Sequence, residues 1–316
     1  MKKLFLPLLA LLFLISCSAP RGSSSSRWMQ ENGKIKVLST TSQVGDLVAY
    51  VGGGRVDNWT LISGDLDPHS YELVKGDGEK VERADLVFYN GLGLEHGASL
   101  SALLHKNPKA IPLGEAIRKK SPELILEKEG AIDPHLWMDL SLWEKSIEEI
   151  VEKLSTTDPD SSLYYEERGK ELQSRMEQED LQLREMLQKI PSEKRYLVTS
   201  HDAFRYFARA YLKEAGEENW EERFTAPEGL APEGQLSPVD LQAVILFLQK
   251  HRVSVLFPES NVGQGVIGKI AQASRDMGFP IRLCTKPLYG DATGDLTYFE
   301  AMQRNGELLA EELSQQ

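Results

Sequence analysis

The sequence predicts an α/β protein made of two similar parallel-sheet lobes, bridged by one long rigid α-helix, with a ligand site in the cleft between the lobes. Short apolar strands alternate with helical segments in both halves of the chain, which is typical of parallel βαβ units. Residues 195–212 repeat the strand-to-helix pattern of residues 36–51. At 316 residues the chain is long enough to bury two hydrophobic cores.

The first half contains the elements of one lobe, which we predict over residues 34–157. Runs of apolar residues predict strands, and apolar residues at helical spacing predict helices. The glycines at 52–54 end the first of these helices. The predicted strands are 34–40, 59–62, 85–89 and 110–113, and the predicted helices are 43–51, 80–84 and 142–154.

A bridging helix, residues 158–191, follows the break at Thr157-Asp158-Pro159. Its apolar residues recur at helical spacing without a sustained heptad, so a single rod of roughly 45 Å is favoured over a coiled coil. The second lobe is predicted over residues 192–316. Its predicted strands are 195–200, 253–257 and 280–284, and its predicted helices are 203–212, 238–251, 266–277 and 297–313.

Residues 1–17 predict an export signal. Two lysines precede the apolar run 4–15, which is too short to span a membrane. The run ends in Leu14-Ile15-Ser16-Cys17, which resembles a bacterial lipobox, in which the cysteine is lipidated; an ordinary secretory signal is the alternative. The serine-rich residues 18–33 predict a flexible tether. We therefore expect an exported protein, periplasmic or at the cell surface, anchored to a membrane by lipidated Cys17.

Composition and missing motifs exclude several function classes. A net charge of −12 offers no basic surface for nucleic acid. With Cys17 lipidated, Cys284 is the remaining cysteine, so no intramolecular disulfide is expected. The chain has no P-loop, no Gly-x-Ser-x-Gly elbow and no His-Glu-x-x-His helix. The glycine-rich run 91–97 predicts a turn, because its last glycine comes one residue too late for a dinucleotide-binding loop.

Two short stretches, Asp67-Pro68-His69 and Asp133-Pro134-His135, each place a histidine directly after a proline. Proline fixes its own φ and favours extended geometry before it, so each imidazole stands at the end of a rigid turn. A third histidine, His201, lies where an apolar strand gives way to a helical pattern. Any one of these could be a capping or core residue, but two copies of one motif favour a shared site. Three imidazoles and a carboxylate are ligands typical of a transition-metal site.

The carboxylate must come from the second lobe. Asp291, in a glycine-flanked loop, is the preferred fourth ligand. Glu259, just after a predicted strand, is the competitor, and a supporting role behind a ligand suits it better. Asp202, next to His201, is an alternative ligand or supporting residue, or a cap for the following helix. The other histidines, His96, His105 and His251, do not follow a rigid turn at a strand end and are expected to be solvated or structural.

Several motifs together resemble one known family. They are residues 67–72 (Asp-Pro-His-x-Tyr-Glu), 84–95, 133–139 (Asp-Pro-His-x-Trp-x-Asp), 198–204 (Val-Thr-Ser-His-Asp-Ala-Phe), 231–238 (Ala-Pro-Glu-Gly-x-x-Ser-Pro), 257–259 and the Asp291 loop. In this order, from about Lys34 to the C-terminus, they resemble the cluster A-I zinc/manganese solute-binding lipoproteins of bacterial ABC importers. The resemblance implies two lobes of the TroA-like fold around a metal ion, and it maps the ligands onto His69, His135, His201 and Asp291.

Two departures bear on the choice of metal. Zinc-dedicated members of the family often carry a long histidine-rich loop in the first lobe, whereas residues 63–80 contain only His69. Manganese-dedicated members often have glutamate where this chain has His201. Nitrogen-rich sites bind zinc more tightly than manganese. The resemblance therefore leaves zinc, manganese and iron open.

The resemblance implies a binding protein, not an enzyme: it would capture one divalent metal ion as cargo and deliver it to an ABC permease and its ATPase. We expect a monomer. A zinc hydrolase is the main alternative, although catalytic zinc usually keeps one open position, which four side chains would fill. A surface adhesin or a receptor for a metal chelate, of the same architecture, is the second alternative.

Overall fold

The computed structural model describes residues 24–232 and 237–315. The predicted export signal and Cys17 lie outside these residues, as do residues 233–236 of the Ala-Pro-Glu-Gly motif. Helix α1 (Ser24–Trp28) belongs to a unit, residues 1–32, that is separate from the compact unit of residues 33–316. Part of the predicted flexible tether is therefore helical. Among the helices of the described residues, none is long and apolar enough to cross a membrane.

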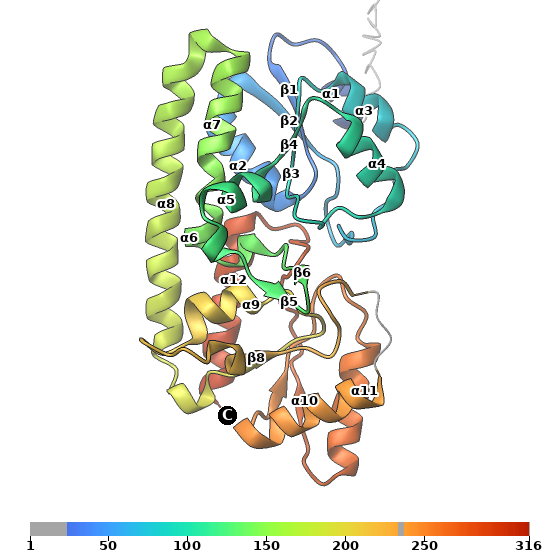
Figure 1. Ribbon diagram of the computed structural model, residues 1–316, viewed down its shortest axis with the longest axis vertical. Helices are drawn as coiled ribbons and strands as arrows, with labels where there is room; N and C mark the ends of the chain where they lie inside the picture. Colours follow the sequence, from blue (N-terminus) through green and yellow to red (C-terminus); the bar gives the residue numbers. More distant parts are fainter. Residues whose placement is uncertain (1–23, 233–236, 316) are drawn as a thin grey trace, which may run out of the picture. The chain divides into compact units, whose positions relative to one another are not determined.

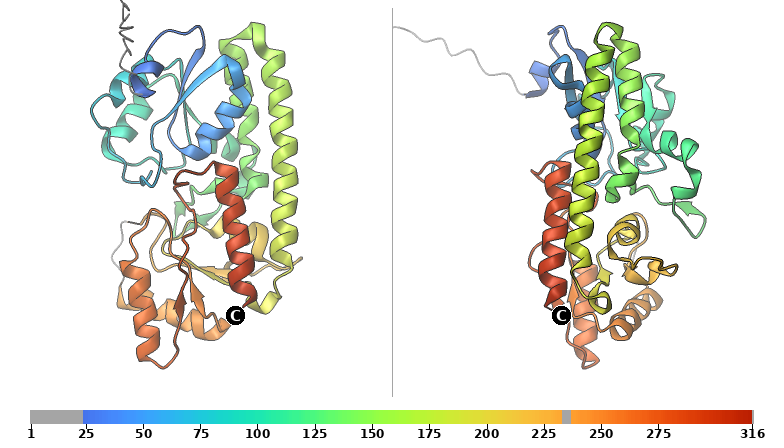
Figure 2. Two further views of the ribbon diagram at one scale, coloured as in Figure 1. Left: turned by 180° about the vertical axis from the view of Figure 1, so that it is seen from behind. Right: turned by 90° about the vertical axis from the view of Figure 1, so that its left-hand side faces the viewer.

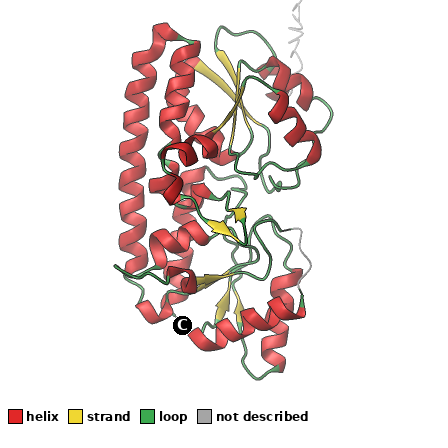
Figure 3. Cartoon of the chain, in the orientation of Figure 1, coloured by secondary structure: helices red, strands yellow, loops and turns green. Residues whose placement is uncertain are grey.

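A four-stranded parallel sheet in the order β2-β1-β3-β4 forms the centre of the first lobe (Figure 1, Figure 3). Its strands are β1 (Ile35–Ser39), β2 (Val56–Thr60), β3 (Leu86–Tyr89) and β4 (Ala110–Pro112). In the central strand β1, Val37 pairs with Asn58 on one side and Leu38 pairs with Val87 on the other. Because all four strands run in the same direction, the residues that follow them gather at one edge of the sheet.

Helices and short turns connect these strands and follow the last of them. They are α2 (Ser42–Gly52), η1 (Gly53–Arg55), α3 (Asp77–Arg83), α4 (Ala98–Lys106), α5 (Leu113–Lys120) and η2 (Pro122–Leu124). Helix α3 begins three residues before the predicted helix, and α4 and α5 were not predicted. The start of α4 is capped from a distance, because the Glu72 carboxylate accepts hydrogen bonds from the backbone N–H groups of Ala98 and Ser99 at 2.7 and 2.8 Å. A cap 26 residues away leaves no local signal in the sequence.

A small antiparallel hairpin leads from the first lobe toward the second. It consists of β5 (Glu127–Lys128) and β6 (Ala131–Ile132), and η3 (Leu136–Met138), α6 (Leu140–Trp143), α7 (Ser146–Thr157) and η4 (Pro159–Ser161) follow it. The hairpin was not predicted, because strands of two residues carry no periodicity. It contacts the second lobe through Arg205, whose Nη1 donates to the Glu127 carbonyl at 3.2 Å.

The long helix is α8 (Ser162–Gln188), with 27 residues, and it runs alongside both lobes (Figure 2). Arg168 Nε donates to the Tyr50 carbonyl in the first lobe at 2.6 Å. Gln188 Nε2 donates to the Tyr211 carbonyl in the second lobe at 3.0 Å. Gly169 permits close packing on α7, since a Cβ there would lie 2.7 Å from Val151 Cγ2. The fold class predicted from the sequence, two α/β lobes bridged by one helix, is confirmed.

The second lobe repeats the strand-and-helix plan with shorter strands. Its elements are η5 (Ser192–Lys194), β7 (Leu197–Val198), α9 (Arg205–Phe207), the π-helical turn η6 (Ala208–Leu212), η7 (Trp220–Arg223), β8 (Phe224–Thr225), α10 (Pro238–His251), β9 (Val255–Leu256), α11 (Gly265–Asp276), β10 (Arg282–Leu283) and α12 (Tyr298–Ser314). β7 pairs with β8 and β9 pairs with β10, both in parallel. The Phe257 N–H donates to the Val198 carbonyl at 3.1 Å and places the two pairs side by side.

Candidate metal centre

The two Asp-Pro-His stretches fold in the same way. In each, the aspartate Oδ1 accepts the backbone N–H of the histidine two residues later, at 2.9 Å for Asp67 and His69 and at 3.0 Å for Asp133 and His135. This short side-chain turn and the intervening proline fix the direction of the imidazole. Asp133 makes a second contact, because its Oδ1 lies 2.7 Å from His135 Nδ1. Asp67 instead accepts the Ser70 hydroxyl.

His201 follows strand β7, and the carboxylate of Glu259 holds it from behind. Glu259 Oε1 accepts the backbone N–H groups of Ser200 and His201 at 2.9 and 2.8 Å. Its other oxygen, Oε2, lies 2.8 Å from His201 Nδ1. The imidazole therefore presents Nε2 away from Glu259. Glu259 follows strand β9, so the shared edge of the second lobe's parallel strands brings the two residues together.

The loop that carries Asp291 belongs to the second lobe in sequence, but the first lobe holds it. Gln43 Nε2 donates to the Asp291 carbonyl at 2.7 Å, and Trp137 Nε1 donates to the Gly290 carbonyl at 3.0 Å. Tyr298, at the start of α12, donates its hydroxyl to the Trp137 carbonyl at 2.6 Å. These contacts fix the Asp291 carboxylate at the boundary between the lobes.

The structure brings together all four predicted ligands. One nitrogen or oxygen atom from each of His69, His135, His201 and Asp291 lies within 4.8 Å of the others, and all four residues are buried. The Nε2 atoms of His69 and His135 are 3.3 Å apart. The Asp291 oxygens lie 3.3 Å from His135 Nε2, 3.1 Å from His201 Nε2 and 3.6 Å from His69 Nε2. The donor atoms therefore point at one small volume.

Burial and neighbouring charges shift the pKa values of the imidazoles in opposite directions. Burial lowers the pKa of His69 to about 3, so this ring is neutral. Burial also disfavours the charged form of His135, but its hydrogen bonds to Asp133 and Asp291 outweigh this and raise its pKa to about 9. Against the same desolvation, Glu259 and Asp291 raise the pKa of His201 well above its usual value. Although burial opposes it, the surrounding histidines hold the pKa of Asp291 well below the ordinary carboxylate range.

The remaining candidates lie outside this group of four. Asp202 does not cap the next helix, which begins at Arg205; its carboxylate forms an ion pair with Lys128 of the hairpin. Glu259 lies behind His201, on the side of Nδ1, and its supporting role stays a prediction. His105 faces its own helix, with Nδ1 2.8 Å from the Ser101 carbonyl. His96 is exposed, and the centre of its ring lies 5.4 Å from that of His69.

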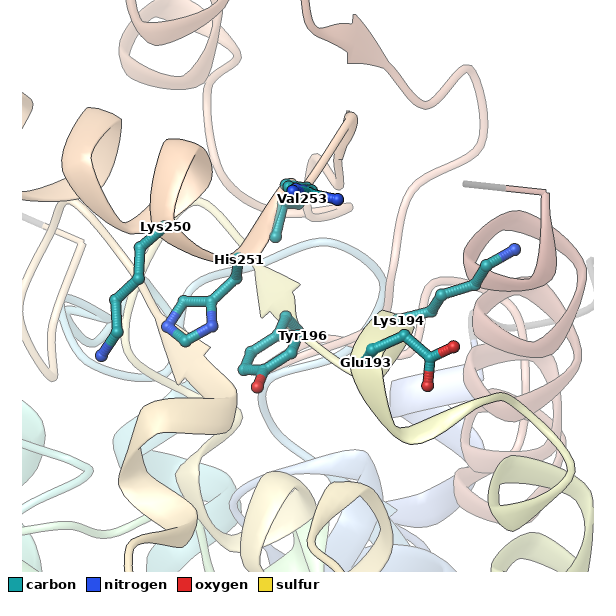
Figure 4. A pocket seen from close by; sticks show the side chains of 7 residues that line it. Glu193, Lys194, Tyr196, Lys250, His251 and Val253 are labelled. Atoms are coloured by element: carbon teal, nitrogen blue, oxygen red, sulfur yellow. The ribbon is translucent and has the colours of Figure 1, made fainter.

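A cavity of about 540 Å³ lies away from this centre, around Tyr196 and His251 (Figure 4). Tyr196 precedes β7 and Val253 precedes β9, so the cavity is at the opposite end of these strands from His201. The His251 ring stacks on Tyr196 with centroids 4.0 Å apart, in agreement with the structural role expected for it. The residues that line the cavity are Glu193, Lys194, Tyr196, Lys250, His251, Arg252 and Val253.

The sequence analysis missed the support that Asp133 gives to His135. The signal was present, because Asp133 belongs to the same Asp-Pro-His motif. A metal-bound histidine usually donates its second ring N–H to a carboxylate or carbonyl, which fixes its tautomer. Asp133 Oδ1 takes this position beside His135 Nδ1, and Glu259 Oε2 lies 2.8 Å from His201 Nδ1, within reach of the same contact. Asp67, the counterpart of Asp133 in the first motif, accepts the Ser70 hydroxyl, so His69 and His135 are held differently.

A buried group of three imidazoles and one carboxylate between two lobes defines a binding protein for a transition-metal ion. Residues 37–312 match the family model described as ZnuA, zinc-uptake complex component A, periplasmic, and the chain belongs to this family. It is 39% identical to the metal-binding protein YtgA of Chlamydia pneumoniae over 302 residues, which cover 95% of this chain and 92% of YtgA. It is 30% identical to the manganese-binding lipoprotein MntA of Bacillus subtilis, over 83% of this chain and 82% of MntA.

A solved structure supports the same assignment. The crystal structure of Fe(III)-bound YtgA from Chlamydia trachomatis aligns with a TM-score of 0.84 and 39% identity, over 89% of this chain and 98% of that one. The family predicted from the sequence motifs is confirmed. The chain is a metal-binding, solute-binding protein of the kind that serves ABC importers.

Proposed function

We propose that His69, His135, His201 and Asp291 together bind one transition-metal ion as cargo, and that the protein passes this ion to an ABC permease. The observation that carries the proposal is the convergence of four buried donor atoms from opposite lobes within 4.8 Å. Imidazole nitrogens 3.3 Å apart, with carboxylate oxygens 3.1–3.6 Å from the ring nitrogens, form a cage suited to a cation.

The donor set supports zinc, iron or manganese as cargo. Three nitrogen donors and one oxygen donor bind zinc more tightly than manganese, by the usual order of divalent affinities. The similar proteins differ in the metal that their names give: zinc for the family, manganese for MntA and Fe(III) for YtgA. Ion availability would then decide which metal is carried, and a direct competition between metals is the informative measurement.

The test is metal content after exposure to equal concentrations of zinc, manganese and iron, in wild type and in His201→Ala. His105→Ala is the matched control, because His105 is exposed on α4 and contacts its own helix. We expect one equivalent of metal in the wild type and in the control, and loss of that metal in His201→Ala. No stoichiometric metal in any of the three would overturn the four-ligand proposal and favour a receptor for a metal chelate.

We also propose that the protein is not an enzyme. Four side chains would fill a four-coordinate shell, whereas catalytic zinc keeps one position for water or substrate. The relatives named above are metal-binding proteins. Hydrolytic activity that disappears when the metal is removed would contradict this view.

We further propose export and membrane anchoring by lipid on Cys17, with the permease as the partner and the monomer as the working state. The basis is the lipobox-like sequence 14–17 and the lipoprotein relative MntA. Cys17→Ala should move the protein from the membrane fraction to the soluble fraction. Equal membrane association of the variant and the wild type would refute lipid anchoring.

A further inference from the structure

Glu228 is a buried carboxylate that the four-ligand site does not use. It lies three residues after strand β8, and the residue is 8% exposed. Among the described residues, none forms a hydrogen bond with its Oε2 atom, which is buried. A buried carboxylate oxygen without a partner is costly, since burial removes its hydration and supplies nothing in exchange. Such an atom calls for a compensating positive group.

The parallel strands place Glu228 at the same edge as His201 and Glu259. These two residues follow β7 and β9, the two neighbouring strands in the second lobe. The Asp202 N–H donates to the Gly229 carbonyl at 3.0 Å and ties the Glu228 loop directly to the turn that carries His201. Burial raises the pKa of Glu228; of its charged neighbours, His201 lowers this pKa and Glu259 raises it. Glu228 is therefore a near neighbour of the metal centre on the side of the second lobe.

Other polar atoms at this edge are also buried without a protein partner among the described residues. They are the hydroxyl oxygens of Ser200 and Ser260 and both amide atoms of Asn261. Ser200 follows β7, and Ser260 and Asn261 follow β9, so the topology gathers them at the end of the strands where Glu228 lies. Groups of this kind suit a passing ion that still carries part of its water shell, because they can hydrogen-bond to that water.

Glu228 also lines a cavity of about 370 Å³ beside the hairpin. Lys128 and Glu129 of the hairpin and Asp240 of α10 line the same cavity. The Lys128 ammonium pairs with Asp202, so the positive charge at the cavity is already compensated. The remaining carboxylates give the cavity a negative potential, which raises the local concentration of cations.

We propose that Glu228 is a transient ligand on the entry route: it receives a partly hydrated divalent cation from this cavity and passes it to the ligand group through His201. This rests on the proposed function, because the final destination is the four-ligand site. The exchange is a change of ligands only. The ion gains a Glu228 oxygen in place of a water molecule, and then gives up that oxygen as the imidazole nitrogens and Asp291 bind it.

The test is the kinetics of Zn²⁺ binding to the purified full-length protein, measured by stopped flow against a fluorescent zinc chelator. Glu228→Gln keeps the shape and removes the charge. We expect both the association and the dissociation rate to fall by about tenfold, the lower end of what a charged cleft adds to an on-rate. The equilibrium Kd should stay within about threefold, since a group that binds the ion only on the route changes the same barrier for entry and for release. Glu129→Gln removes an exposed charge from the same cavity, so it is the matched control for the negative potential alone and should lower both rates clearly less than Glu228→Gln does.

Unchanged rates in Glu228→Gln would overturn the proposal. A higher Kd with an unchanged association rate would also overturn it, because Glu228 would then be part of the final site. If Glu228→Gln does not fold, Glu228→Asp serves instead. It retains the charge on a shorter side chain that reaches less far, so its association and dissociation rates should both be lower than those of wild type. A higher Kd with an unchanged association rate in Glu228→Asp would likewise refute entry through this residue. If the wild-type protein binds no zinc at all, the proposed function itself is refuted.

Discussion

Replacing Glu259 by glutamine tests the metal centre through a residue that is not one of the four proposed ligands. One oxygen of Glu259 accepts two backbone N–H groups, and the other lies 2.8 Å from His201 Nδ1. In Glu259→Gln the amide oxygen would keep the two backbone N–H groups, so the amide NH₂ would face His201. The imidazole must then accept at Nδ1 and carry its proton on Nε2, the atom that points to Asp291.

The expected loss follows from this change of tautomer. Removing a carboxylate behind a metal-bound histidine costs about 10- to 100-fold in metal affinity, which is about 1.4–2.8 kcal/mol of binding free energy. The number of protons released on binding should also fall by one, because burial lowers the pKa of His201 and Glu259 contributes most to raising it. Competition with a zinc chelator at several pH values measures both quantities.

The matched control is Glu95→Gln. Glu95 is also a buried glutamate whose carboxylate accepts two successive backbone N–H groups, those of Asn90 and Gly91, but its other partner is the Thr40 hydroxyl and not an imidazole. We expect this variant to lose stability without a change in the number of protons released. A Kd of Glu259→Gln within twofold of wild type, or an equal effect of both substitutions on proton release, would refute the tautomer argument.

Three further outcomes follow from the structure. His135 and His201 have raised pKa values and are protonated at pH 7. Metal binding should therefore release two protons, and the affinity for the metal should rise with pH up to about 9. Calorimetry in buffers of different ionisation enthalpy counts the released protons, and a count of zero or three would contradict the assignment. Gly97→Ala would place a Cβ 2.0 Å from the Tyr71 carbonyl oxygen and should lower the free energy of unfolding by about 1–3 kcal/mol in denaturant titration, whereas Gly78→Ala, with open space around it, should not. Because α8 is bonded to both lobes, metal binding should change the scattering-derived radius of gyration very little, and a large change would argue against a stiff bridge.

The convergence of the three imidazoles could be predicted from the sequence, because the position of each one depends on local geometry; their role as ligands stays a prediction. Asp67 and Asp133 orient the histidines two residues later, and the prolines between them restrict the backbone. A side-chain turn over three residues can be read directly from a motif. The position of His201 at the end of a strand could be predicted from the apolar strand pattern alone. For the same reason the alternation of strands and helices was enough to predict the fold class.

Other features depend on contacts that no local pattern contains. The Asp291 loop is held by Gln43 and Trp137, which are 248 and 153 residues away from their partners in the chain. Helix α4 is capped by Glu72, and the hairpin at residues 127–132 has strands of only two residues. Tertiary contacts of this kind override weak local propensity, so these elements were missed or displaced in the prediction.

The three imidazoles differ in protonation state before a metal ion binds, so they differ in how readily each can bind the incoming ion. His135 and His201 each have a carboxylate at Nδ1, which favours their protonated form when no metal is bound. His69 is neutral, with a pKa near 3, so it offers a lone pair without first losing a proton. Asp291 is already ionised and is held in place by the first lobe. In the proposed site, His69 and Asp291 are therefore ready to bind an incoming ion, while the other two imidazoles exchange their protons for it. That exchange becomes more favourable as pH rises and less favourable as pH falls. The carboxylates that hold the two imidazoles for metal binding at neutral pH therefore stabilise their protonated forms in acid, which favours metal release.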